Sequence, residues 1–205
     1  MKILGKLKIV KNREVVYESE MKSFVKNFTL FLMSKIGNRA VTVVDVDGVE
    51  HEINFGYLRL RQPARYWQSY EVLIFEQCDA PENDDTFGIL VGSGTTPVSP
   101  NDYRLENPYT SDVVAYSSCM VSQVTVSDNT MKFTFARPII NTSQDSITIN
   151  ETGIVMWVRR YIRDSYGVRL DVNFKMLIAR DVLQNPVTLN PLEGAEVIYT
   201  FQITT

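Results

Sequence analysis

The sequence of 205 residues contains a single histidine, His51, and only two cysteines, Cys78 and Cys119. One histidine cannot build a metal site made of histidines, and it argues against a catalytic triad that depends on histidine. Two cysteines are a background count, so we expect free, buried thiols, with a disulfide between them as the alternative. We therefore expect no cofactor.

The chain also lacks long apolar runs and any excess of basic residues. No segment reaches the roughly 18 apolar residues that a membrane-spanning helix needs. Lys6 and Lys8 interrupt the N-terminal stretch before the apolar region of a secretory signal could form. The net charge is -3, whereas non-specific binding to nucleic acid needs a basic field. We expect no membrane span and no secretory signal, and nucleic acid is disfavoured as a partner.

Polar and apolar residues alternate over most of the chain, which is the pattern of half-buried β-strands. The pattern predicts hairpins over 6–21, 41–55 and 113–135, a strand at 147–158 that breaks near Gly153, an Arg/Tyr-rich loop over 159–171, and strands at 87–91, 174–180, 187–189 and 194–204. Antiparallel strands at this spacing are typical of a β-sandwich or jelly roll. We expect one mainly β domain over 1–205, in which 40–75 is an inserted β-arm or subdomain.

One helix is predicted, from Ser23 to Ile36. Ser23 is an acceptable N-cap, and Gly37-Asn38 is a typical helix end. Apolar residues at three- and four-residue spacing fall on one face; they are Phe24, Phe28, Phe31, Leu32 and Ile36. This face fits a helix that covers one end of the sandwich, and docking on a partner subunit is the alternative.

The segment 87–109 begins as a buried strand and continues as a long loop. Its Gly92-Ser93-Gly94 stretch allows a positive φ or a close approach to another segment. Two prolines then impose extended geometry, and Asp102 can cap a turn. Ordered loops of this length are commonly functional or lie in interfaces. The residues predicted to structure this loop are Gly92, Gly94, Asp102 and Glu106.

Catalytic motifs are missing from this loop. Gly92-Ser93-Gly94 lacks the spacing of the nucleophile elbow of hydrolases, and the lysine of a phosphate-binding loop does not follow it. Asp102 and Glu106 could form a carboxylate pair that hydrolyses glycosides. A turn cap at Asp102 and bonds from Glu106 to loop amides are favoured instead, so we expect no enzymatic activity. The acidic stretches 45–47 and 79–85 could hold calcium but lack the spacing of a calcium loop, so solvated loops are favoured.

Arginine and aromatic residues are interleaved in two segments, which is the most unusual composition in the chain. The interface candidates are Arg59, Arg61, Arg65, Tyr66 and Trp67 in the first segment, and Arg160 and Tyr161 in the second. These residue types are enriched in buried interfaces, so a subunit interface is favoured. Ordinary amphipathic strands, or stacking on sugars or single-stranded bases, are the alternatives.

Four motifs along the chain occur together, in the same order, in a known group of proteins. They are Ser23-Phe24-Val25-Lys26-Asn27-Phe28; Gly92-Ser93-Gly94-Thr95-Thr96-Pro97 with Asp102-Tyr103-Arg104-Leu105-Glu106; Ser146-Ile147-Thr148-Ile149-Asn150-Glu151-Thr152-Gly153; and Leu177-Ile178-Ala179-Arg180-Asp181-Val182-Leu183 with Pro191, Glu193 and Gly194. With these motifs the chain resembles virion structural proteins of bacteriophages and archaeal viruses. The resemblance covers most of the chain outside 40–75 and 158–172.

The resemblance implies a jelly-roll-like β-sandwich built into the head, neck or tail of a virus particle. Such a protein would be made in the host cytoplasm and located in the virion, with copies of itself and other virion proteins as partners. Together with the Arg/aromatic segments, this favours a non-enzymatic structural protein, such as a capsid decoration, neck or tail component. The alternative is a carbohydrate-binding or receptor-binding module of a viral tail or spike, which would bind a host-surface glycan.

Overall fold

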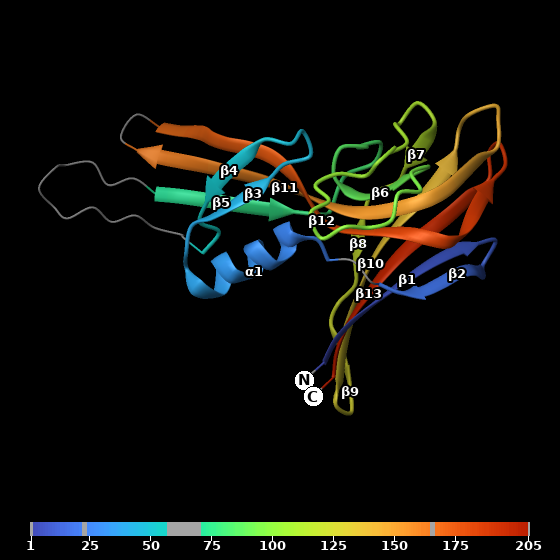
Figure 1. The fold of residues 1–205 in the computed structure, drawn as a ribbon, viewed down its shortest axis with the longest axis horizontal. Coiled ribbons are helices and arrows are strands. Elements are labelled where there is room, and N and C mark those ends of the chain that lie inside the picture. The colour runs from blue at the N-terminus through green and yellow to red at the C-terminus, as the bar shows by residue number, and fades with distance from the viewer. Residues whose placement is uncertain (1, 22–23, 57–70, 165–166, 205) are drawn as a thin grey trace, which may run out of the picture.

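The structure is a computed structural model that describes residues 2–21, 24–56, 71–164 and 167–204. Within these ranges the protein is mainly β, with antiparallel sheets packed together and one helix near the N-terminus (Figure 1). The prediction of a mainly β, sandwich-like fold is confirmed.

Two sheets and a small hairpin make up the fold. The first sheet has the order β2 (Glu14–Glu20), β1 (Lys2–Lys11), β13 (Gly194–Thr204), β10 (Thr130–Asn141) and β7 (Val114–Tyr116), and β8 (Met120–Val121) and β9 (Thr125–Ser127) also pair with β10. The second sheet has the order β12 (Gly167–Leu189), β11 (Ile147–Asp164) and β5 (Glu71–Gln77), and β6 (Gly88–Gly92) pairs with β11. The separate hairpin consists of β3 (Val41–Val44) and β4 (Glu50–Ile53).

The long strands are paired in a nested way. β10 pairs with β13 in the first sheet, and the two strands between them in sequence, β11 and β12, pair with each other in the second sheet. A long hairpin is therefore folded over, so that its inner half packs on its outer half, as in a jelly roll. Both layers contribute to one hydrophobic core, for example Phe135 and Tyr199 from the first sheet and Ile154 and Met176 from the second.

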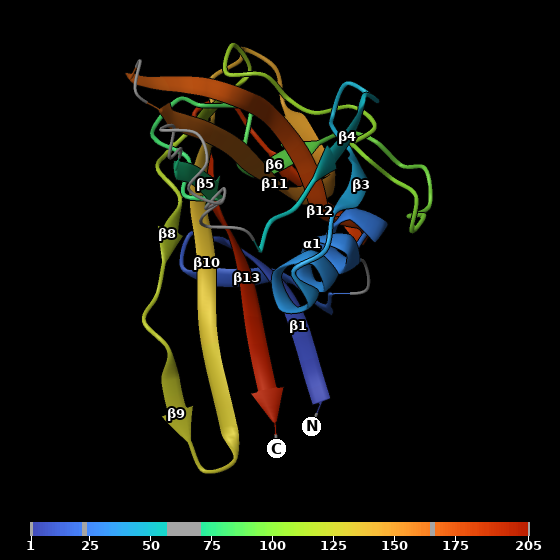
Figure 2. The same ribbon diagram turned by 90° about the vertical axis from the view of Figure 1, so that its left-hand side faces the viewer.

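One end of the first sheet extends beyond the second sheet. We call this part, formed by residues 2–6, 125–134 and 200–204, the distal blade. Figure 2 shows β9, β10, β13 and β1 running side by side into it, and both ends of the described chain lie at its tip. The blade thus presents sheet surface that the second layer does not cover.

The helix α1 (Lys26–Gly37) lies against β12 and β3. It begins after Val25, whose backbone is extended and whose side chain makes no capping hydrogen bond, so the prediction of Ser23 as the N-cap is wrong. The predicted end is confirmed, because Asn38 follows the helix in the left-handed conformation.

The predicted apolar face of α1 is only partly correct, because Phe28 and Phe31 pack against the core but Leu32 and Ile36 are exposed. Ile36 is 84% exposed, whereas Asn27 and Ser34 are buried. The Asn27 side chain donates to the Val44 carbonyl (2.7 Å) and accepts from the Val44 amide (3.1 Å), and the Ser34 hydroxyl accepts from the Phe55 amide (2.8 Å). Polar side chains satisfy the backbone of the neighbouring hairpin here, and the spacing of apolar residues cannot identify such a face.

The described part of segment 40–75 shares the main core. Phe55 is buried in that core, and His51 stacks on Phe174 of β12 with ring centroids 4.1 Å apart. The His51 Nε2 atom lies 2.7 Å from the Asp45 carboxylate, which also accepts from the turn amides of Asp47 and Val49. The hairpin is therefore packed on the second sheet, and β5 is one of that sheet's strands.

β11 and β12 are longer than the strands predicted for these parts of the chain. The loop expected at 159–171 is strand on both sides of residues 165 and 166, and β11 has no break at Gly153. β12 also joins the strands expected at 174–180 and 187–189, and it includes Pro186, which an edge strand tolerates. The β11–β12 pair contains three register shifts. At each shift β12 carries more residues than β11, which interrupts the alternation of faces along β12, so a search for period two ends that strand there.

Arg137 of β10 is a buried cation that ties the two layers together. Its five N–H groups donate to the backbone carbonyls of Ser117 (2.8 Å), Phe87 (3.1 Å), Ile89 (3.0 Å), Pro81 (3.1 Å) and Asp84 (2.6 Å). The guanidinium also lies over the Tyr116 ring, 4.6 Å from its centroid. One side chain therefore fixes the acidic loop 79–85 and β6 against the first sheet, and its desolvation is offset by these hydrogen bonds.

We expect Arg137→Met to destabilise the fold by at least about 3 kcal/mol, because several buried carbonyls lose their donor. Arg104→Met is the matched control, since Arg104 is exposed, and its effect should stay within about 0.5 kcal/mol. Urea unfolding followed by tryptophan fluorescence measures both. Equal midpoints for the two variants would show that the buried guanidinium is dispensable.

Candidate functional site

A buried ion pair anchors the long loop after β6. Glu151 of β11 and Arg180 of β12 are 0% and 2% exposed, and the Arg180 Nε donates to Glu151 Oε2 at 2.8 Å. Arg180 also donates to the Asp102 carboxylate (2.7 Å) and to the Thr96 carbonyl (3.2 Å). The loop is thus bound to two neighbouring strands of the second sheet.

Backbone amides of the loop complete this cluster. Glu151 accepts hydrogen bonds from the amides of Gly94 (3.2 Å), Glu106 (3.0 Å) and Asn107 (2.7 Å). A charge that is fully buried is stabilised only when its remaining lone pairs are occupied in this way. The cluster therefore fixes both ends of the loop at one carboxylate.

The two predicted carboxylates act within the loop itself. Asp102 accepts from the Ser99 amide at 3.0 Å, and Glu106 accepts from the amides of Thr95 and Thr96 at 2.7 Å each. A hydrogen bond from the Thr96 hydroxyl, together with the bonds from the two amides, lowers the pKa of Glu106. These contacts match the predicted roles of a turn cap and an amide acceptor.

The two predicted glycines are required for close approach. A Cβ atom at Gly92 would lie 2.5 Å from the Asn107 carbonyl oxygen, and one at Gly94 would overlap with the Glu151 carboxylate. Neither glycine has a positive φ. Of the two roles that the sequence offered for these glycines, a positive φ and a close approach to another segment, the structure therefore shows the close approach.

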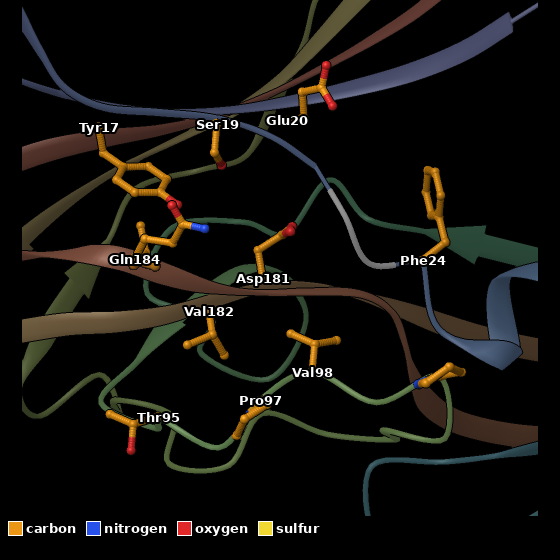
Figure 3. A pocket seen from close by; sticks show the side chains of 12 residues that line it. Tyr17, Ser19, Glu20, Phe24, Thr95, Pro97, Val98, Asp181, Val182 and Gln184 are labelled. Carbon is orange, nitrogen blue, oxygen red and sulfur yellow. The ribbon is translucent and has the colours of Figure 1, made fainter.

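A pocket of about 560 Å³ lies between β2, the loop and β12 (Figure 3). Its apolar wall includes Pro97 and Val98 from the loop and Val182 from β12. Its acidic residues are Glu20, which is exposed at the rim, and Asp181, which is 5% exposed. The volume is in the range of ligand sites, and the anchored loop supplies one rigid side of it.

The pocket follows the outer edge of β12. The consecutive residues 181–184 all line it, although successive side chains of a strand point to opposite faces. Beside them the pairing is irregular, because Glu151 stands opposite Val182 and Ile149 opposite Val187, which leaves residues 183–186 opposite Asn150 alone. Such bulges re-aim side chains next to binding sites.

The Asp181 carboxylate is connected to the core behind the pocket. It interacts with the hydroxyl of Tyr199, which lies 3.4 Å from the Thr152 hydroxyl. Burial raises the pKa of Tyr199 well above its ordinary value, and the negative charge of Asp181 adds to this effect. Tyr199 is therefore a neutral, fixed neighbour of the acidic side of the pocket.

The structure separates the two predicted interface residues that it describes. Arg160 and Tyr161 are neighbours on β11, so their side chains project from opposite faces of the second sheet. Tyr161 packs edge-on against Phe75, and the guanidinium of Arg159 lies 3.9 Å from the centroid of the Trp157 ring. The other five interface candidates, Arg59, Arg61, Arg65, Tyr66 and Trp67, lie outside the described residues.

An apolar surface covers one face of the distal blade. Val126 pairs with Met131, and Met131 pairs with Ile203, so the three side chains share a face. Val126 and Met131 are 70% and 38% exposed. The next row on this face is Phe133 and Phe201, whose rings stack with centroids 4.9 Å apart, and Phe201 packs against the core. The apolar face of the core therefore extends onto the part of the blade that is exposed to solvent.

Metal ligands, membrane spans and thiols can also be assessed in the described part of the chain. There, no group of three or more His, Cys, Asp or Glu side chains is placed to hold a metal ion, and no helix is long and apolar enough to cross a membrane. Cys78 and Cys119 are free thiols, as expected. Burial raises the pKa of Cys78 to about 12, so this thiol stays protonated at neutral pH.

Sequence reasoning assigned no role to the charges that organise the site, namely Arg137, Glu151, Arg180 and Asp181, although the last three stand within the quoted motifs. A signal was present for Arg180 and Asp181, because they interrupt the apolar run 177–183.

Comparison with known proteins adds no family: no family model, curated protein or solved structure matches the chain. Function must therefore be inferred from the surfaces and contacts of the chain itself.

We expect Gly94→Ala to destabilise the protein by about 1–3 kcal/mol, because its Cβ atom would push the Glu151 carboxylate away from the loop. Gly37→Ala is the control, since its Cβ atom would meet only the Arg39 side chain, at 3.8 Å. Thermal unfolding compares the two, and exchange of the Asn107 amide reports on the loop. The close approach has no energetic role if both variants unfold at the same temperature.

Proposed function

We propose that this protein is a non-enzymatic structural subunit of a virus particle, which assembles with copies of itself and with other virion proteins. The observation that carries the proposal is the apolar face of the distal blade. Contiguous apolar surface of this kind on a folded domain marks a protein–protein contact. A blade that extends beyond its own sandwich is suited to reach a neighbouring subunit.

The two faces of the blade support this assignment. On one face lie Val126 and Met131, and on the other the pair Ser127–Thr130 and the pair Thr125–Lys132. Both faces of a strand exposed only to water would be polar. The apolar face therefore fits burial against another chain.

Two further observations support a structural role. The four sequence motifs, in their order, resemble virion proteins. The carboxylates of Asp102 and Glu106, which the sequence offered as a hydrolytic pair, accept hydrogen bonds from Arg180 and from loop amides. These hydrogen bonds hold the loop in place, and the carboxylate oxygens are engaged in them instead of facing a substrate.

One observation favours the alternative of a glycan-binding module. Phe75 is 44% exposed and lies beside Tyr161 on the second sheet, where aromatic rings could stack on a sugar. Trp157 is less suited, because Arg159 lies over its ring and Phe87 packs 5.2 Å away. Selective binding on a glycan array that is lost in Phe75→Ala would establish this alternative.

We expect the protein to form oligomers at micromolar concentration, and we expect the double variant Val126→Lys/Met131→Lys to form a smaller species or the 23.4 kDa monomer. Charges on the apolar face would remain buried and unpaired in the contact. Light scattering coupled to gel filtration measures the mass.

The matched control is Ser127→Lys/Thr130→Lys, which places the same charges on the same two strands but on the opposite face. It should assemble like the wild type. A wild-type protein that stays monomeric at about 100 μM, or a blade variant with the wild-type mass, would contradict assembly through this face.

A further inference from the structure

The outer edge of β12 already pairs with other segments of the chain. Ala179 forms an antiparallel bridge with Phe24, and the Ile178 carbonyl accepts from the Val25 amide at 3.2 Å. The next residues along this edge, 181–184, line the pocket instead. Because an edge strand offers backbone groups to a further strand, an extended segment fits this place better than a compact ligand.

The two sides of this edge differ in chemistry. Figure 3 shows Asp181 on the side of β12 that faces Ser19, and Val182 on the side of Pro97. Glu20 adds a second carboxylate to the first side. A strand lying in the pocket would therefore meet acidic groups on one side and apolar groups on the other. The Tyr17 and Phe24 rings also line the pocket, and aromatic rings favour cations.

The sequence at 57–61 has the complementary pattern. It reads Tyr57-Leu58-Arg59-Leu60-Arg61, so leucine and arginine alternate with period two. In an extended strand the leucines would lie on one side and the arginines on the other. The whole segment 57–70 contains three arginines and no aspartate or glutamate.

We propose that residues 57–61 of one copy bind as an added strand along residues 181–184 of a neighbouring copy. Arg59 and Arg61 face Asp181 and Glu20, and Leu58 and Leu60 face the apolar wall. This inference rests on the proposed self-assembly and supplies one of its contacts. Because the contact joins two different surfaces of the same chain, it is heterologous and produces a ring or a filament.

The test uses a fluorescent peptide with the sequence of residues 57–70. The receptor is the full chain carrying Arg59→Ser and Arg61→Ser, so that its own segments do not compete. Saturable binding is expected by fluorescence anisotropy. Glu20→Lys in the receptor should weaken binding at least about tenfold, because it reverses a charge at the pocket rim. Glu14→Lys, on the same strand but outside the pocket, should leave binding within about twofold.

Two readouts separate strand addition from attraction by charge alone. A peptide with Arg59→Leu and Leu60→Arg has the same composition but a broken alternation, and it should bind more weakly. Amide hydrogens of residues 181–184 should exchange more slowly in the complex. Equal binding of both peptides, or unchanged exchange at 181–184 at saturation, would overturn the proposal.

These experiments distinguish failure of the pocket contact from failure of the proposed structural role. If the peptide does not bind but the wild-type chain assembles and the blade variant does not, this contact is wrong and the structural role stands. If the peptide binds with the expected dependence on Glu20 but the wild-type chain is monomeric at every concentration, the pocket does accept this segment, but both the contact between copies and assembly through the blade are wrong.

Discussion

The buried ion pair between Glu151 and Arg180 is the constraint on which the functional surface depends. Each partner sits on a different strand of the second sheet, and each reaches the same loop. A charge buried this deeply is tolerated only with its partner and its hydrogen bonds in place. Strand register, loop conformation and pocket shape are therefore coupled: a shift of β12 against β11 would move Arg180 away from the carboxylate that holds the loop.

The same coupling explains why a long loop can form a rigid wall. Gly92 of β6 pairs with Glu151, so the loop leaves the sheet at the residue that binds its far end. Glycine at this point is dictated by the closeness of Asn107 rather than by a left-handed backbone. A binding surface held in this way is preorganised, which lowers the entropy that a partner must remove on binding.

Turn chemistry and alternation were the parts of the structure that the sequence could predict. The hairpin around Asp47 and Gly48 and the bond between Asp102 and the Ser99 amide follow from rules that act over a few residues, and Glu106 reaches amides 10 and 11 residues away within the same loop. The polar part of the buried face of α1 was missed because Asn27 and Ser34 are buried through bonds to a hairpin distant in sequence. Arg137 was missed for the same reason: its five acceptors lie between positions 81 and 117, and no local pattern links them to β10.

The nested pairing has a consequence for how the chain folds. β13 lies between β1 and β10, pairing with strands that begin 192 and 64 residues before it in sequence (194 - 2 = 192 and 194 - 130 = 64). Until β13 is in place, the first sheet exists as two separate pieces with their core faces exposed. Contacts so distant in sequence require loop closure before they stabilise anything, so folding is slow, on the order of milliseconds to seconds, and concerted. Exposed sheet edges during that interval make the unfinished chain prone to aggregation, and the interval ends when β13 joins β1 to β10.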